Sequence, residues 1–138
     1  MDYNISNSKI YTKSTKGEIL RNQPKYNFFK NTSYAIKGLI DLIKNETSFK
    51  IELIITLILL PTIFFVDTSL TNKLLMFITL MGMLLAETIN SAIERTVDLV
   101  TLKHHPMAGR AKDVGSAIVF ISIFIFVITW GSIILSTL

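Results

Sequence analysis

The sequence predicts an all-α integral membrane protein, with three transmembrane helices preceded by an amphipathic surface helix. Half of the 138 residues are hydrophobic and only 17% are charged, which is typical of a membrane protein or of one unusually apolar domain. The distribution of charge favours the membrane protein, because residues 114–138 contain no Asp, Glu, Lys or Arg over 25 positions. At about 1.5 Å per residue, this run is long enough to cross a bilayer.

The N-terminal part of the chain has two sections. Residues 1–25 are rich in Asn, Ser, Thr and Lys without periodicity, so we predict a polar, mobile tail and assign it no function. From 26 to 45, apolar positions such as Phe29, Ile36 and Ile43 alternate with lysines at helical spacing. A basic amphipathic helix of this kind either lies in the membrane interface or packs on a partner subunit.

Two shorter uncharged runs follow, at 53–66 and 74–86, with 14 and 13 residues. Alone they would suit buried helices of a soluble protein. Predicted helices at about 48–67 and 71–98 extend beyond both runs and are long enough to span a bilayer. The short polar link between them makes them an antiparallel hairpin.

The third span is predicted at 111–137. The segment before it contains His104, His105, Pro106 and Gly109, so the second span should end there and the chain should turn. Together with the surface helix, the spans make residues 26–138 a single membrane domain.

The basic residues predict the orientation of the chain. Residues 1–50 hold nine Lys or Arg, residues 66–73 hold one and residues 95–112 hold four. By the positive-inside rule, the N-terminus is cytoplasmic and the C-terminus lies on the outer side. Basic residues that flank the predicted spans account for the net positive charge, so no nucleic acid is predicted as a partner. The sequence contains no cysteine, which excludes thiolate chemistry.

Polar residues at the cytosolic end of the second span share one helical face: Glu87, Asn90, Ser91, Glu94 and Asp98. Carboxyl groups at a membrane boundary are costly, so this stripe is interpreted as an active site. A desolvated Glu87 suits a general base, although it could instead be a structural carboxylate bonded to Asn90. Glu94 and Asp98 suit a magnesium and phosphate site or a solvated acidic face.

Two other segments carry possible binding groups. Glu46, at the corner before the first span, either supplies a second metal ligand or faces the dipole of a helix start. Residues 109–113 contain Arg110 and Lys112, which either form a phosphate site at the start of the third span or anchor the chain at the membrane surface. No glycine-rich phosphate loop is present in the sequence.

The motif Glu-x-x-Asn-Ser-Ala-Ile-Glu at 87–94, followed by Val97, Asp98, His105 and Pro106 and by Gly-Arg-Ala-Lys-Asp-Val-Gly-Ser-Ala at 109–117, closely resembles the prokaryotic diacylglycerol kinase family. The resemblance covers about residues 26–138. It implies a homotrimer of the inner membrane, with a periplasmic C-terminus, that transfers the γ-phosphoryl group of magnesium-ATP to diacylglycerol.

The resemblance also implies roles for individual residues. Glu87 matches the catalytic base, Glu46 and Glu94 match ligands of Mg²⁺, and Asn90, Lys112 and Asp113 match other active-site positions. Nucleotide contacts are implied near Lys30, Tyr34, Lys37, Asp98 and Lys112. Ile36 and Ile40 depart from the family pattern in the surface helix, where a tryptophan and an arginine are expected.

Three alternatives to a diacylglycerol kinase stay open. The same catalytic residues would serve an undecaprenol kinase, which differs from the leading hypothesis only in its lipid. A small oligomeric ion-coupled channel would use Glu87 along a proton or cation path, but it leaves Lys112 without a role. A structural membrane subunit would explain none of the carboxylates.

Overall fold

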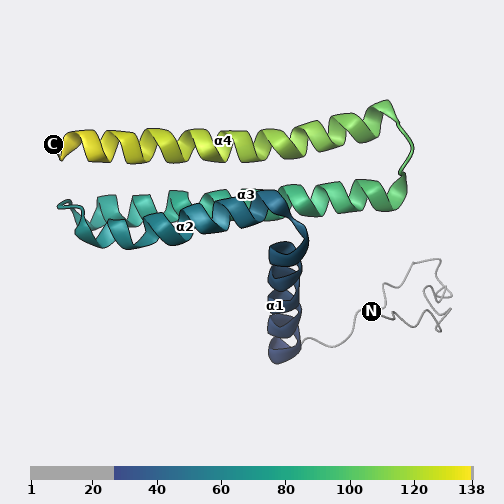
Figure 1. Cartoon of the computed structure of the whole chain (residues 1–138), viewed down its shortest axis with the longest axis horizontal. Coiled ribbons are helices and arrows are strands. Elements are labelled where there is room, and N and C mark those ends of the chain that lie inside the picture. Colours follow the sequence, from purple (N-terminus) through teal and green to yellow (C-terminus); the bar gives the residue numbers. More distant parts are fainter. Residues whose placement is uncertain (1–26, 138) are drawn as a thin grey trace, which may run out of the picture. The chain divides into compact units, whose positions relative to one another are not determined.

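The computed structural model describes residues 27–137, and all regular structure within them is helical. The tail predicted at 1–25 lies outside the described residues. The chain divides into two compact units, of which the first ends at Ile36 and the second begins at Lys37. The helices, shown in Figure 1, are α1 (Phe28–Asn45), α2 (Thr47–Phe65), α3 (Leu70–Val100) and α4 (Pro106–Ser136).

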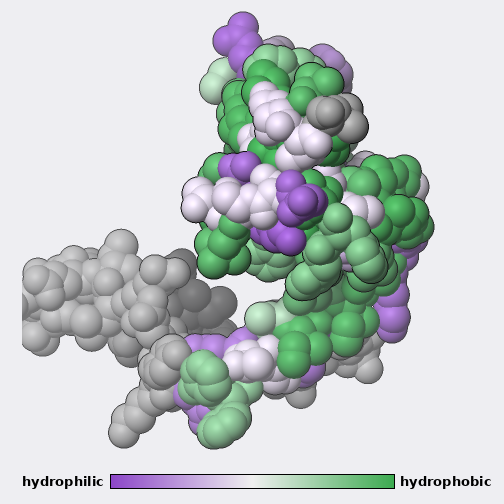
Figure 2. Space-filling view, turned by 90° about the vertical axis from the view of Figure 1, so that its left-hand side faces the viewer, coloured by the Kyte–Doolittle hydropathy of each residue, from purple (hydrophilic) through white to green (hydrophobic). Residues whose placement is uncertain are grey.

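The helices α2, α3 and α4 are each long and apolar enough to cross a membrane. This confirms the three spans predicted from the uncharged runs. Large hydrophobic side chains remain exposed along them, and they cover much of the face seen in Figure 2. Such a surface is unusual on a soluble monomer and is expected where lipid or another subunit takes the place of water.

The third predicted span begins earlier in the structure than the sequence pattern indicated. α4 starts at Pro106 rather than near Ala111, because His105 caps its first turn and its Nδ1 accepts a hydrogen bond from the Met107 amide at 3.2 Å. Proline suits the first helical position, where its missing N–H would have no helical partner. α3 likewise continues to Val100, and Ser69 caps its start by accepting from the Asn72 amide.

α3 packs against both α2 and α4 (Figure 1). Toward its start, Met76 and Leu80 are fully buried in a cluster with Ile63 of α2 and Trp130 of α4. The Trp130 indole Nε1 donates a buried hydrogen bond to the Met76 carbonyl at 3.1 Å. Because neighbours cover α3 on two sides, polar residues further along this helix are buried as well.

Candidate active site

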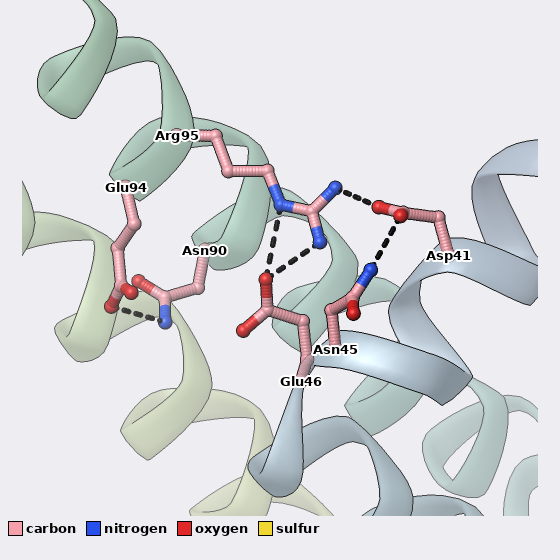
Figure 3. Close-up of polar contacts among 6 residues, drawn as sticks. All are labelled: Asp41, Asn45, Glu46, Asn90, Glu94 and Arg95. Carbon is pink, nitrogen blue, oxygen red and sulfur yellow. Dashed lines mark hydrogen bonds and ion pairs between the residues drawn. The ribbon is translucent and has the colours of Figure 1, made fainter. Parts of the chain in front are cut away.

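The second half of α3 carries the polar stripe that the sequence predicted. Glu87, Asn90 and Ser91 are buried, with exposures of 5%, 9% and 3%. Asn90 Nδ2 donates a hydrogen bond to Glu94 Oε1 at 3.1 Å, one turn further along the helix (Figure 3). The helical periodicity therefore placed these side chains on a common face, as expected.

α4 approaches this stripe closely at Gly115. A Cβ atom on Gly115 would lie 2.5 Å from Asn90 Oδ1, which is closer than real Cβ contacts. Asn90 Oδ1 is itself buried and has no hydrogen-bond partner among residues 27–137. A buried polar atom without a partner is uncommon in proteins and marks a strained or functional position.

Two more buried polar atoms without partners in the described chain lie one turn apart on α2, at Glu52 Oε2 and Thr56 Oγ1. Glu52 is near enough to Glu87 for the two charges to interact, and Glu94 and Glu46 act on Glu87 in the same way. The site is thus a group of carboxyl groups contributed by α2, α3 and the residue before α2. Such a concentration of like charge attracts cations.

Glu46 lies at the N-cap of α2, with an extended backbone. Its side chain makes no capping hydrogen bond to its own helix. Instead, Oε1 accepts hydrogen bonds from Arg95 Nε at 3.0 Å and Arg95 Nη2 at 2.7 Å (Figure 3). The side chain therefore faces α3 rather than the amide groups of its own helix, and the metal-ligand role of Glu46 stays a prediction.

Arg95 also pairs with Asp41 through Nη1, and Asn45 Nδ2 donates to the other Asp41 oxygen at 2.6 Å. The hydrogen bond from Arg95 lowers the pKa of Asp41 below its usual value, despite an opposing effect of partial burial. Arg95 and Asp41 are not among the site residues predicted from the sequence. One sequence signal could have indicated a role for Arg95. It is a cation that directly follows Glu94, in a stretch of helix whose other charged residues are acidic.

At the end of α3, Lys112 Nζ of α4 forms an ion pair with Asp98 at 2.7 Å. The phosphate site predicted at Arg110 and Lys112 stays a prediction, but Lys112 does not lie at the free amide groups of the helix start. The helix begins at Pro106, and the Gly109 amide already bonds the His105 carbonyl at 3.0 Å, so Lys112 lies beyond the free N–H groups. Lys112 and Asp98 instead line a pocket of about 310 Å³ at the turn between α3 and α4, with Lys103, His104, His105 and Gly109 among its other lining residues.

A second cavity, of about 340 Å³, is lined almost entirely by apolar side chains. Its wall includes Thr88, the residue directly after Glu87. The other lining residues come from α1, α2 and α3: Leu39, Ile43, Phe49, Leu53, Leu84 and Leu85. An apolar space of this kind fits a hydrocarbon chain.

The remaining predicted site residues are exposed. Lys30, Tyr34 and Lys37 lie on α1, where Lys30 Nζ is 5.9 Å from the centre of the Tyr34 ring. Asp113 follows Lys112 in α4 and is exposed. Among residues 37–137, no hydrogen bond or ion pair joins Lys37 or Asp113 to the carboxyl groups of the site.

Within residues 27–137, no group of three or more His, Cys, Asp or Glu side chains is placed to hold a metal ion. Mg²⁺ commonly uses one or two carboxylates together with phosphate oxygens and water, so the pair predicted from the sequence, Glu46 and Glu94, has the chemistry of such a ligand set. Both Arg95 hydrogen bonds to Glu46 use Oε1, and Oε2 has no hydrogen-bond partner in the described chain.

Comparison with known proteins assigns a family to this arrangement. The family described as prokaryotic diacylglycerol kinase matches residues 33–134. A diacylglycerol kinase of Haemophilus influenzae is 40% identical over 103 residues, which cover 75% of this chain and 87% of that protein. One from Pseudomonas aeruginosa is 36% identical, covering 75% and 85% of the two chains.

A relative with a different name is the undecaprenol kinase of Bacillus subtilis. It is 36% identical over 92 residues, covering 67% of this chain and 75% of that protein. The family match covers most of the described helices and includes the whole polar stripe of α3. The chain therefore belongs to the prokaryotic diacylglycerol kinase family and is a lipid kinase.

Proposed function

We propose that this enzyme transfers the γ-phosphoryl group of ATP to the free hydroxyl of diacylglycerol, giving phosphatidic acid. The observation that carries the proposal is the position of Glu87. This carboxyl is 5% exposed, its neighbour Thr88 borders an apolar cavity, and the charges of Glu94 and Glu46 act on it. The apolar cavity suits the lipid, and the carboxyl groups suit the cation that accompanies a phosphate donor.

Glu87 acts as the general base in this proposal. Glu87 accepts the hydroxyl proton as the lipid oxygen bonds to the γ-phosphorus. The bond from that phosphorus to the bridging oxygen breaks, and ADP leaves. Positioning and charge neutralisation supply most of the catalysis in phosphoryl transfer, so no soluble kinase fold is required.

Glu46 and Glu94 would hold Mg²⁺, which when bound neutralises charge on the phosphate groups. Asn90 fixes the Glu94 carboxylate through its hydrogen bond of 3.1 Å. Lys112, now paired with Asp98 at 2.7 Å, supplies a cation that can transfer to the phosphates. The pocket lined by both residues is the space proposed for the nucleotide, with further contacts from Lys30, Tyr34, Lys37 and Asp113.

The apolar cavity suits the acyl chains of the lipid, because its wall is made of leucine, isoleucine and phenylalanine side chains. A chain that enters there brings the glycerol hydroxyl toward Thr88 and Glu87. Burial of hydrocarbon contributes about 25 cal/mol per Å² and carries no information about the headgroup. The polar end of the lipid is therefore the part that decides specificity.

The proposed setting is the inner membrane, with a cytoplasmic N-terminus and a periplasmic C-terminus. The count of basic residues at each end of the spans supports this orientation. Helix α1 is proposed to lie in the interface as an amphipathic helix. The exposed hydrophobic side chains of the spans are compatible with a homotrimer, in which other subunits cover part of this surface.

Purified enzyme supplied with labelled ATP, Mg²⁺ and diacylglycerol in mixed micelles tests the proposal. We expect labelled phosphatidic acid and ADP in equal amounts. Undecaprenol is tested in parallel, because the Bacillus subtilis relative is an undecaprenol kinase. Equal or preferred use of undecaprenol would refute the choice of diacylglycerol, and ATP-independent conductance without lipid product would favour the channel.

A further inference from the structure

We propose that Arg95 is a positioning residue that holds the Glu46 carboxylate in the orientation needed to bind a divalent cation. This inference rests on the proposed function, since it concerns the metal site of the same reaction. Its basis is the network of Asp41, Asn45, Glu46 and Arg95, in which four side chains meet at the corner between α1 and α2 (Figure 3).

The guanidinium group binds Glu46 through one oxygen only. Arg95 Nε and Nη2 donate to Oε1 at 3.0 and 2.7 Å, and Oε2 accepts no hydrogen bond from residues 27–137. Two donors on one oxygen restrict rotation of the carboxylate more than a single contact would. The arrangement thus fixes Glu46 while leaving an oxygen available for a cation.

Glu46 has a competing conformation that Arg95 prevents. As the N-cap residue of α2, it lies beside the free amide groups of the first helical turn, which attract carboxylates. Yet the side chain makes no capping hydrogen bond and turns to α3 instead. Without Arg95, we expect the Glu46 side chain to cap its own helix for part of the time. It would then lie away from the other carboxyl groups of the site.

Asp41 and Asn45 hold the guanidinium group in place from the other side. Arg95 pairs with Asp41 through Nη1, and Asn45 Nδ2 donates to Asp41 Oδ1 at 2.6 Å. Arg95 and Asp41 side chains are each 45% exposed, so their pairing contributes little to folding stability. Orientation of Glu46 is therefore the effect that the network can produce.

Charge and geometry predict opposite changes in affinity for a divalent cation when Arg95 is removed. A positive charge beside Glu46 repels a divalent cation, so loss of that charge alone would strengthen metal binding. Loss of orientation would weaken it, because partners that orient metal ligands typically contribute about 10- to 100-fold in metal affinity. We infer that orientation is the larger effect.

The experiment measures binding of Mn²⁺, with a non-hydrolysable ATP analogue present, by the electron paramagnetic resonance signal of free Mn²⁺. Variants Arg95→Gln and Asp41→Asn are compared with the unchanged enzyme. We expect about tenfold weaker Mn²⁺ binding for Arg95→Gln and a smaller loss for Asp41→Asn. The matched control is Lys73→Gln, which removes a cation near the other end of α3 and should leave Mn²⁺ binding unchanged.

Arg95→Lys separates charge from geometry, because lysine keeps the charge but cannot donate from a rigid planar fork. We expect it to restore little of the lost Mn²⁺ affinity. Unchanged or tighter binding by Arg95→Gln, or full recovery with lysine, would overturn the inference. Failure of the unchanged enzyme to phosphorylate any lipid would refute the proposed function instead, and this Mn²⁺ titration does not depend on lipid turnover.

Discussion

Gly115 of α4 lies so close to Asn90 of α3 that a Cβ atom would sit 2.5 Å from the Asn90 Oδ1. Asn90 is buried and holds Glu94 through a hydrogen bond, so it has little freedom to move aside. Gly115→Ala should therefore destabilise the fold by about 1–3 kcal/mol through overpacking. Thermal unfolding in detergent measures this, and the rate of lipid phosphorylation should fall because Asn90 is displaced.

Gly131 is the matched control, since it lies in the same helix and a Cβ there meets no atom within 4 Å in the described structure. Alanine is favoured over glycine in a helix by about 1 kcal/mol, so Gly131→Ala should be neutral or stabilising. If both substitutions behave alike, the close approach of α4 to Asn90 is not a constraint in solution.

Glu87→Gln should abolish phosphoryl transfer while leaving assembly intact. The amide keeps the shape of the side chain but cannot accept the hydroxyl proton, and general bases typically contribute about 10²- to 10⁴-fold in rate. Initial rates of labelled phosphatidic acid formation measure the loss, and size-exclusion chromatography in detergent checks assembly. Near-normal turnover would remove Glu87 from the mechanism.

Lys112→Gln should weaken use of ATP much more than it weakens the fold. The ion pair with Asp98 is about half exposed, with side-chain exposures of 37% and 47%, so its loss should cost less than about 1 kcal/mol. If Lys112 contacts the phosphates, the KM for ATP should rise about tenfold or more, since hydrogen bonds to charged groups contribute about 1.5–3 kcal/mol. An unchanged KM would leave Lys112 as a structural partner of Asp98 only.

The Asp41 pair should give the fold a small dependence on pH, in keeping with the exposure of both side chains. The hydrogen bond from Arg95 lowers the pKa of Asp41 below its ordinary value of 3.8, and the charge of Lys44 acts in the same direction. A lowered pKa in the folded state means that the contribution to stability is present above pH 3.8 and is lost as the pH falls through the lowered value.

Denaturation of the unchanged enzyme and of Asp41→Asn between neutral and acidic pH measures this dependence. The difference in unfolding free energy between the two proteins should be constant near neutrality and shrink in strong acid. A difference that grows as the pH falls below 3.8 would contradict the ionised pair seen in the structure.

The α3 stripe could be predicted from the sequence because its information is local. Glu87, Asn90 and Glu94 recur at steps of three and four, so any helix through them brings the side chains together. The three spans were equally predictable, since uncharged runs of sufficient length have few other stable environments.

The Arg95 network could not be predicted in this way. Arg95 is separated from Asp41 by 54 positions and from Glu46 by 49, and no periodicity relates residues on different helices. The early start of α4 was missed for another reason. His105 caps the helix through a ring nitrogen, and histidine is not among the side chains that usually indicate a helix start.

Trp130 donates its indole N–H to the Met76 carbonyl and is the one tryptophan in the sequence. The emission of this enzyme therefore comes from a ring wedged between two of its spans, with 6% of its surface accessible. A red shift or quenching by a water-soluble reagent would report that α4 has separated from α3. The chain thus carries an intrinsic optical probe, with which helix association can be followed without an attached dye.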